Sequence, residues 1–169
     1  MSSGAPPPRD ELLQRLTAVE RRLHQHAHRD TSTILERRTD PDPPTGETWQ
    51  WGQVWAHLAE FLPYWLAEAR QVITAYSGEP VPFGRTKSDP ERVAAIERDR
   101  NAAVHALWQR THDGIGETHT FLRELPDGAW AVRGVHSTLG VMPLAQIVDE
   151  FMVGHLEQHA AQLDGLAAG

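Results

Sequence analysis

Hydrophobic residues recur along the chain at steps of three and four positions, which is typical of amphipathic helices. In residues 10–28 the repeat falls on Leu12, Leu16, Val19 and Leu23, and arginines occupy the other side. The pattern therefore predicts a first helix that buries one face.

A second helix is predicted to start between Thr48 and Trp51 and to run to about Tyr76, with Pro63 inside it. Proline removes a backbone donor and clashes with the preceding turn, so we expect a kink there. The preceding segment, residues 29–48, is polar and contains three prolines and a glycine. Its length predicts a long crossover between helices 1 and 2 instead of a tight hairpin.

A third helix is predicted over residues 89–125, because it opens with Asp-Pro-Glu and keeps the helical apolar repeat. Gly114 and Gly116 weaken its middle, which predicts a bend at that point. Residues 77–88 are expected to form a loop. Residues 129–142 are expected to be irregular, with a short strand-like piece near 130–135.

The fourth helix is predicted over residues 143–166. Its core-facing stripe contains two histidines among apolar residues: Leu144, Val148, Phe151, His155, His159 and Leu163. No repeat of 20–50 residues is evident, and no alternation demands a sheet.

Four helices around one core predict an all-α fold, a four-helix bundle with a long crossover between helices 1 and 2. A length of 169 residues fits one domain, which we place at residues 9–169. Residues 1–8 are expected to be a disordered lead-in. They contain no apolar export signal, so the predicted location is cytoplasmic.

Charge and apolar content exclude several classes of function. The net charge is −7 and no basic stripe is present, which argues against nucleic acid as a partner. No apolar run approaches the roughly 18 residues of a membrane-spanning helix. The chain has no cysteine, so any thiol chemistry would require a small-molecule thiol.

The ten histidines hold the candidate chemistry. His155 and His159 lie four residues apart, which places their rings one turn apart on one helix face. His57 lies beside the apolar stripe of the second helix, and pairing of helices two and four would bring it to the same place. Three imidazoles leave one coordination position open, as in catalytic zinc sites. The alternative is that Gln158, Gln162 or backbone carbonyls satisfy three core histidines.

Five further histidines are interpreted as surface residues. His24 and His28 form a second pair at the end of the first helix, where cations are favourable. His105, His112 and His119 recur every seven residues beside the apolar stripe and are expected to line a solvated flank.

Two windows resemble the DinB-like superfamily. Residues 49–60, Trp-Gln-Trp-Gly-Gln-Val-Trp-Ala-His-Leu-Ala-Glu, are similar to its second helix, and residues 142–163 are similar to its last helix, with His-x-x-x-His followed by Gln-Leu. The resemblance implies a four-helix bundle with a long first crossover. It also implies that His57, His155 and His159 bind one divalent metal ion, with Zn²⁺ or Ni²⁺ as the expected metal.

Family members with assigned activities include transferases and isomerases that use mycothiol or bacillithiol at the metal. The resemblance therefore implies a metal-dependent thiol S-transferase that takes a low-molecular-weight thiol and an electrophilic substrate, with a homodimer as the expected assembly. The alternatives are a metal-dependent hydrolase and a non-catalytic metal-binding or stress-response bundle.

Two further questions stay open at this stage. A dimerisation module would use exposed contacts from Trp49, Trp51, Trp108 and Trp130, although tryptophans at helical spacing also pack in cores. No general acid or base is assigned, because Glu60, Glu150 and Glu157 are charged helix positions of a kind that is usually solvated.

Overall fold

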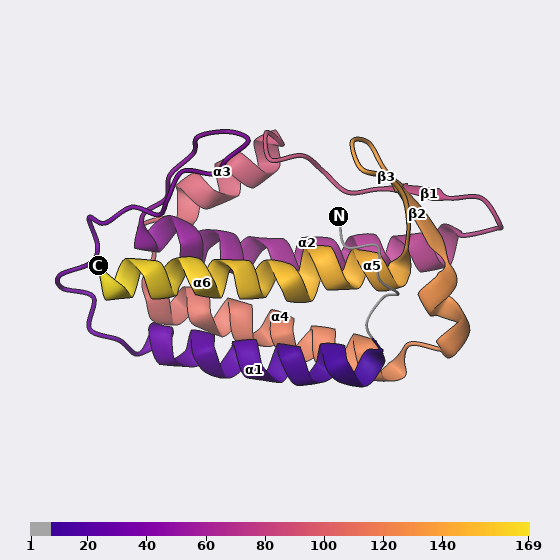
Figure 1. Ribbon diagram of the computed structural model, residues 1–169, viewed down its shortest axis with the longest axis horizontal. Helices are drawn as coiled ribbons and strands as arrows, with labels where there is room; N and C mark the ends of the chain where they lie inside the picture. Colours follow the sequence, from indigo (N-terminus) through magenta and orange to yellow (C-terminus); the bar gives the residue numbers. More distant parts are fainter. Residues whose placement is uncertain (1–7) are drawn as a thin grey trace.

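Four long helices lie side by side and bury their apolar faces against one another (Figure 1). The computed structural model describes residues 8–169. The long helices are α1 (Arg9–Ala27), α2 (Trp51–Ala75), α4 (Val104–Glu124) and a last helix built from α5 (Leu144–Val148), the π-helical turn η2 (Asp149–Val153) and α6 (Gly154–Ala168). The predicted all-α four-helix bundle is confirmed. The predicted lead-in, residues 1–8, lies outside the described residues except for Pro8.

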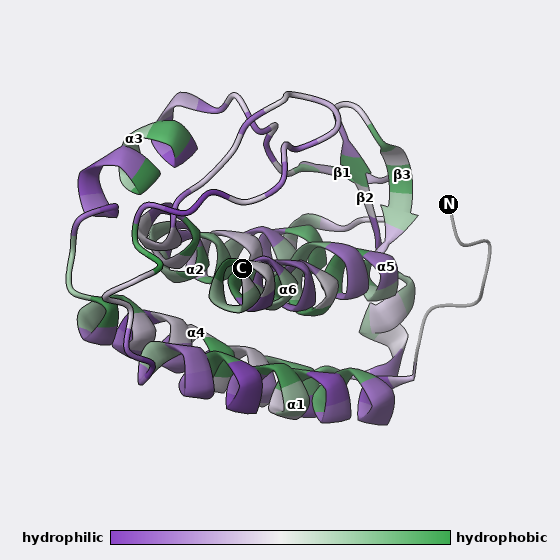
Figure 2. Cartoon of the chain, turned by 60° about the vertical axis from the view of Figure 1, so that its left-hand side comes forward, coloured by the Kyte–Doolittle hydropathy of each residue, from purple (hydrophilic) through white to green (hydrophobic). Residues whose placement is uncertain are grey.

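Amphipathicity explains the packing of these helices. Figure 2 shows hydrophilic positions along the outer side of α1 and hydrophobic positions toward the other helices. Leu12, Leu16, Val19 and Leu23 are all buried, as the repeat predicted. Between residues 8 and 169, no helix combines the length and the apolar character that a membrane span requires.

The connections follow from the order of helices around the bundle. Helices α4 and α6 each pack against both α1 and α2, so α1 and α2 lie diagonally opposite each other. Residues 28–50 make the predicted long connection between them. Helices α2 and α4 run in the same direction, so residues 76–103 return along the outside of the bundle (Figure 1).

The predicted third helix is wrong in one respect, because it is two helices. A short helix, α3 (Pro90–Asp99), ends before a break at residues 100–103, and α4 follows. The break lies where the Arg100 carbonyl approaches Gly52 so closely that an added Cβ would be 2.0 Å away. Helix α4 continues through Gly114, whose missing Cβ lets Leu62 of α2 approach.

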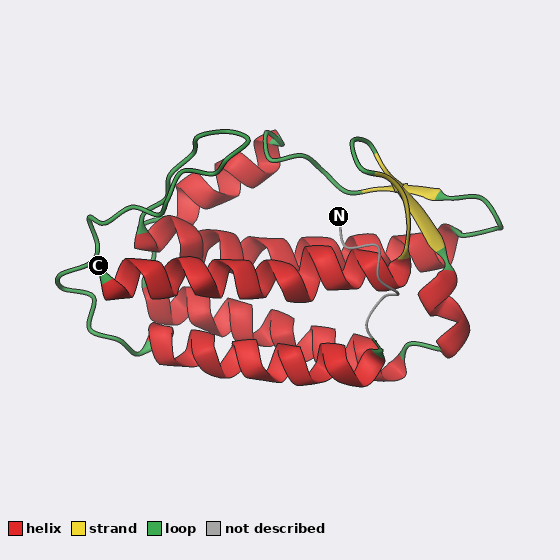
Figure 3. Cartoon of the chain, viewed as in Figure 1, coloured by secondary structure: helices red, strands yellow, loops and turns green. Residues whose placement is uncertain are grey.

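A small sheet lies at one end of the bundle (Figure 3), and only the short strand-like piece near residues 130–135 was predicted from the sequence. Strand β2 pairs in parallel with β1 and antiparallel with β3. The strands occupy segments expected to be loop or irregular: β1 (Val81–Phe83), β2 (Arg133–His136) and β3 (Gly140–Pro143), with a 3₁₀ turn η1 (Asp127–Ala131) before β2. Strands of three or four residues are too short to produce a clear alternation of hydrophobic and polar positions.

The last helix contains a π-helical turn immediately before its histidines. In this turn the Gly154 N–H donates to the carbonyl of Asp149, five residues earlier. Arg15 of α1 stabilises the turn, because its guanidinium donates hydrogen bonds to Asp149 at 2.7 Å and to Glu157 at 2.7 Å. The turn therefore sets the rotation of α6, and with it the direction of the rings of His155 and His159.

Gly154→Ala tests this constraint. A Cβ at residue 154 would lie 2.7 Å from the Asp149 carbonyl oxygen, so the turn must shift. We expect the free energy of unfolding to fall by about 1–3 kcal/mol, the usual cost of overpacking. Urea denaturation measures it. Gly165→Ala in the same helix meets nothing within 4 Å and should be neutral or stabilising; equal losses in both variants would contradict the interpretation.

Candidate metal centre

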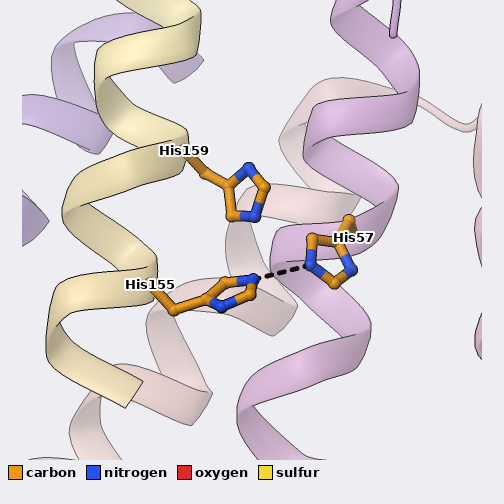
Figure 4. Close-up of side chains that lie close together, drawn as sticks. All are labelled: His57, His155 and His159. Atoms are coloured by element: carbon orange, nitrogen blue, oxygen red, sulfur yellow. Dashed lines mark hydrogen bonds between the residues drawn. The ribbon is translucent and has the colours of Figure 1, made fainter. Parts of the chain in front are cut away.

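The rings of three histidines meet between α2 and α6. His57 extends from α2, and His155 and His159 extend from successive turns of α6, with all three rings pointing toward one another (Figure 4). One ring nitrogen of each histidine lies within 4.8 Å of a ring nitrogen of each of the other two. The Nε2 atoms of His57 and His155 are 2.9 Å apart. The sequence expectation that helices two and four meet at these residues is met.

His57 is held by a buried chain of polar groups. Its Nδ1 lies 2.6 Å from Oε1 of Glu60, one turn along α2. The other carboxylate oxygen, Oε2, accepts from Nη2 of Arg85 at 2.5 Å. With a carboxylate as its acceptor, Nδ1 carries the ring proton. His57 Nε2 is therefore the nitrogen that carries the lone pair, and it accepts a hydrogen bond from Nε2 of His155.

His159 is held in a similar way by its own helix. Its Nδ1 lies 2.7 Å from Oε1 of Gln162, three residues further along α6. The ring of Trp49 stacks on His159 with centroids 5.7 Å apart and planes inclined by 15°. Trp49 also meets the ring of His57 edge-on, with centroids 5.1 Å apart. Both rings are therefore fixed by a hydrogen bond and by an aromatic contact.

The surroundings favour uncharged imidazoles. Burial lowers the pKa of His57 and of His155 well below the ordinary value, and neighbouring positive charge adds to the effect. Burial lowers the pKa of His159 to about 4, although the hydrogen bond to Gln162 opposes this. At neutral pH the three rings are thus neutral, which is the form that binds metals.

The three imidazole nitrogens fit a divalent cation that is intermediate between hard and soft. Three imidazole nitrogens suit zinc, nickel, copper or iron. Two nitrogens on one tetrahedral zinc lie about 3.3 Å apart, given bonds of roughly 2.0–2.1 Å. The observed separations, from 2.9 Å to at most 4.8 Å, bracket that value. A metal-bound histidine commonly donates its second N–H to a carboxylate or another oxygen, as His57 and His159 do here.

The centre opens into a cavity of about 560 Å³. The long connection, residues 38–49, covers one side, and residues 85–92 cover another. In Figure 1 both segments lie above α2 and α6. A small molecule could therefore reach the three histidines, in a cavity whose walls come both from these connections and from α2 and α6.

The other sequence candidates lie elsewhere. His24 and His28 are exposed at the end of α1, where His28 Nδ1 bonds to the carbonyl of His24 at 2.8 Å. His105 and His112 are exposed and His119 is half-buried, in agreement with a solvated flank. Among the described residues, no group of metal-capable side chains other than the three histidines is close enough to hold an ion.

The three glutamates separate into different roles. Glu60 is buried against His57 and Arg85, so its interpretation as a solvated position was wrong. Burial raises the pKa of Glu60, whereas the bond from Arg85 opposes that shift. Glu150 is exposed and Glu157 pairs with Arg15. The signal for Glu60 was present in the sequence, since it lies three residues after His57 and therefore on the same helix face.

The tryptophans do not furnish an exposed patch. Trp49, Trp51 and Trp108 are buried, and Trp130 is half-buried. Trp49 instead lines the cavity, and so does Arg92, a residue that the sequence did not single out. The dimerisation reading based on exposed tryptophans is therefore wrong.

Comparison with known proteins supports the same fold. Neither the protein-family models nor the curated proteins give a match. Among solved structures, the chain is similar to YfiT from Bacillus subtilis, described as a probable metal-dependent hydrolase with an unusual four-helix bundle topology. The TM-score is 0.75 and the identity 21%, over 99% of this chain and 90% of YfiT.

A second similar structure is the mycothiol-dependent maleylpyruvate isomerase, with a TM-score of 0.70 and 16% identity. The match covers 93% of this chain but only 61% of the isomerase. These likenesses confirm that the chain has the four-helix-bundle fold of these two proteins. At such identities they establish the fold alone.

Gln162→Leu tests how the site fixes its rings. Without the amide oxygen, His159 Nδ1 loses its acceptor, and we expect the ring to shift toward the tautomer protonated at Nε2. Nitrogen-15 NMR of the imidazoles of metal-free protein at neutral pH measures the tautomer. Gln158→Leu is the matched control, because Gln158 is exposed on the same helix. An unchanged His159 spectrum in Gln162→Leu would contradict the assignment.

Proposed function

We propose that this DinB-like protein binds one divalent metal ion through His57, His155 and His159, with zinc or nickel as the expected metal. The observation that carries the proposal is the pairing of Nδ1 with an oxygen in both His57 and His159. This pairing leaves Nε2 of both rings for a metal. The descriptions of YfiT as a probable metal-dependent hydrolase and of the isomerase as mycothiol-dependent support it.

We further propose that the protein is an enzyme of the thiol S-transferase type. A bound divalent cation lowers the pKa of a thiol or water molecule that it binds. The chain has no cysteine, so the thiol is a small molecule such as mycothiol or bacillithiol. In the overall reaction a thiol and an electrophile R–X give a thioether and HX: one C–S bond forms, C–X breaks, and the thiol proton leaves with X.

The chain's own groups position and enclose the reactants. Glu60 keeps the proton of His57 on Nδ1, and Gln162 does the same for His159. Trp49 packs against both rings and closes one wall of the cavity. Residues 38–49 and 85–92 supply much of the remaining lining of the cavity.

A metal-dependent hydrolase is the second candidate, and the description of YfiT favours it. Water would then replace the thiol as the nucleophile in the same cavity. A non-catalytic metal-binding bundle is the remaining alternative. A cytoplasmic location and a homodimer stay predictions.

Metal content tests the site itself. Untagged protein, purified without chelator or a nickel column, should contain about one zinc or nickel ion per chain by elemental analysis. His155→Ala should lose it, because two imidazoles on separate helices hold an ion weakly. The control His24→Ala, which removes an exposed histidine, should keep it. A parent that stays empty after incubation with zinc and with nickel would refute the metal site.

Activity assays distinguish the three candidate functions. Loaded protein should consume thiol in the presence of an electrophile such as monochlorobimane, and removal of the metal should abolish the reaction. Ester hydrolysis without thiol consumption would identify a hydrolase. Metal that stabilises the fold with neither activity would identify a non-catalytic bundle, since about 2.7 kcal/mol is expected at a hundredfold excess over Kd.

A further inference from the structure

Arg92 has a buried guanidinium that lines the cavity and forms no ion pair. Its residue surface is 7% exposed. Nη1 donates to the Lys87 carbonyl at 2.7 Å, and no acceptor among residues 8–169 takes a hydrogen bond from Nε or Nη2. No carboxylate of the described chain lies within 4.0 Å of it. Burial lowers the pKa of Arg92, which reflects the cost of holding this charge away from water.

The other cations of the cavity differ from Arg92, because Arg38 is exposed to solvent and the remaining two are paired. Arg85 pairs with Glu60 at 2.5 Å, and Lys87 pairs with Asp42 at 2.6 Å. Both charges are therefore already balanced by an acid. The other acids of the lining, Asp40 and Glu47, are exposed and form no ion pair with Arg92, although Glu47 and Glu60 favour its charged form at longer range.

Arg92 lies close to the three histidines. Its guanidinium carbon is 5.3 Å from the centre of the Trp49 ring, and the same ring contacts His57 and His159. The residue is also firmly placed, because its backbone N–H donates to the Asp89 side chain that caps α3. One small molecule in the cavity could therefore reach both Arg92 and the histidine centre.

We propose that the cavity binds a small carboxylate-bearing molecule, with its carboxylate on Arg92 and its opposite end toward His57, His155 and His159. A guanidinium with Nε and one Nη unpaired matches the two oxygens of a carboxylate. A volume of about 560 Å³ is in the range of small-molecule sites. As a substrate class the inference rests on the proposed function, whereas the carboxylate site itself does not require a metal.

Calorimetric titration of metal-free protein with dicarboxylates from malonate to adipate tests the site. At least one acid should bind, and its diamide should not. Arg92→Gln should weaken binding about tenfold or more, as expected for the loss of a charged hydrogen-bond donor. The affinity of Arg92→Lys should lie between those of the parent and Arg92→Gln, because lysine keeps the charge but lacks the paired N–H donors of the guanidinium. Arg98→Gln is the control, since Arg98 lies exposed on the same helix and pairs with Asp99.

Two results would overturn the proposal: no acid binds more tightly than about 10 mM, or Arg92→Gln and Arg98→Gln bind equally well while both melt like the parent. If Arg92→Gln does not fold, Arg92→Lys is compared with Arg98→Gln instead, and equal binding by these two variants would overturn the proposal. Binding in a protein that takes no metal would leave the carboxylate site standing and remove the metal proposal.

The same titrations with zinc-loaded protein show whether the thiol or the electrophile carries the carboxylate. If the thiol carries it, zinc strengthens the binding of 3-mercaptopropionate far more in the parent than in Arg92→Gln. If the electrophile carries the carboxylate, zinc strengthens the binding of 3-mercaptopropionate equally in both proteins, and the binding of succinate still requires Arg92. Either result supports the carboxylate site, whereas loss of the Arg92 dependence for both probes contradicts it.

Discussion

A buried imidazole must place its ring N–H on an acceptor, and the arrangement around the three histidines follows from that requirement. An unmet donor in the interior costs about 1–3 kcal/mol. His57 therefore needs Glu60, and a buried Glu60 in turn needs the positive charge of Arg85. Arg85 is placed by the small sheet, because β1 ends at Phe83 and His136 of β2 contacts the Arg85 carbonyl. The small sheet at one end of the bundle thus supports the centre.

The topology of the bundle supplies the rest of the cavity. Helices α1 and α2 lie diagonally opposite, and α2 and α4 run in parallel, so two connections must travel over the outside. These are the segments that carry Trp49, Lys87 and Arg92 to the cavity. The bundle therefore fixes the histidines, while the connections determine what kind of molecule can reach them.

The sequence predicted those features that depend on local periodicity. The buried face of α1 and the shared face of His155 and His159 both follow from a helical repeat. The break before α4 was missed because it depends on a tertiary contact, the approach of the Arg100 carbonyl to Gly52. Arg92 was missed for a related reason: whether an arginine in a first turn faces solvent or a cavity depends on the path of a distant connection. Metal binding by the three histidines stays a prediction.

The π-helical turn at Asp149–Val153 amounts to one residue more than a regular α-helix would use for the same rise. If the turn became regular α-helix with all its residues kept, everything beyond it would rotate by up to about 100° around the helix axis, the angle of one residue. Both imidazoles of α6 would then turn away from His57. Deleting one residue of the turn would instead remove the extra residue and leave a regular helix with both imidazoles nearly in place. The centre therefore depends on the number of residues between Asp149 and His155 matching the irregularity of the helix that carries them.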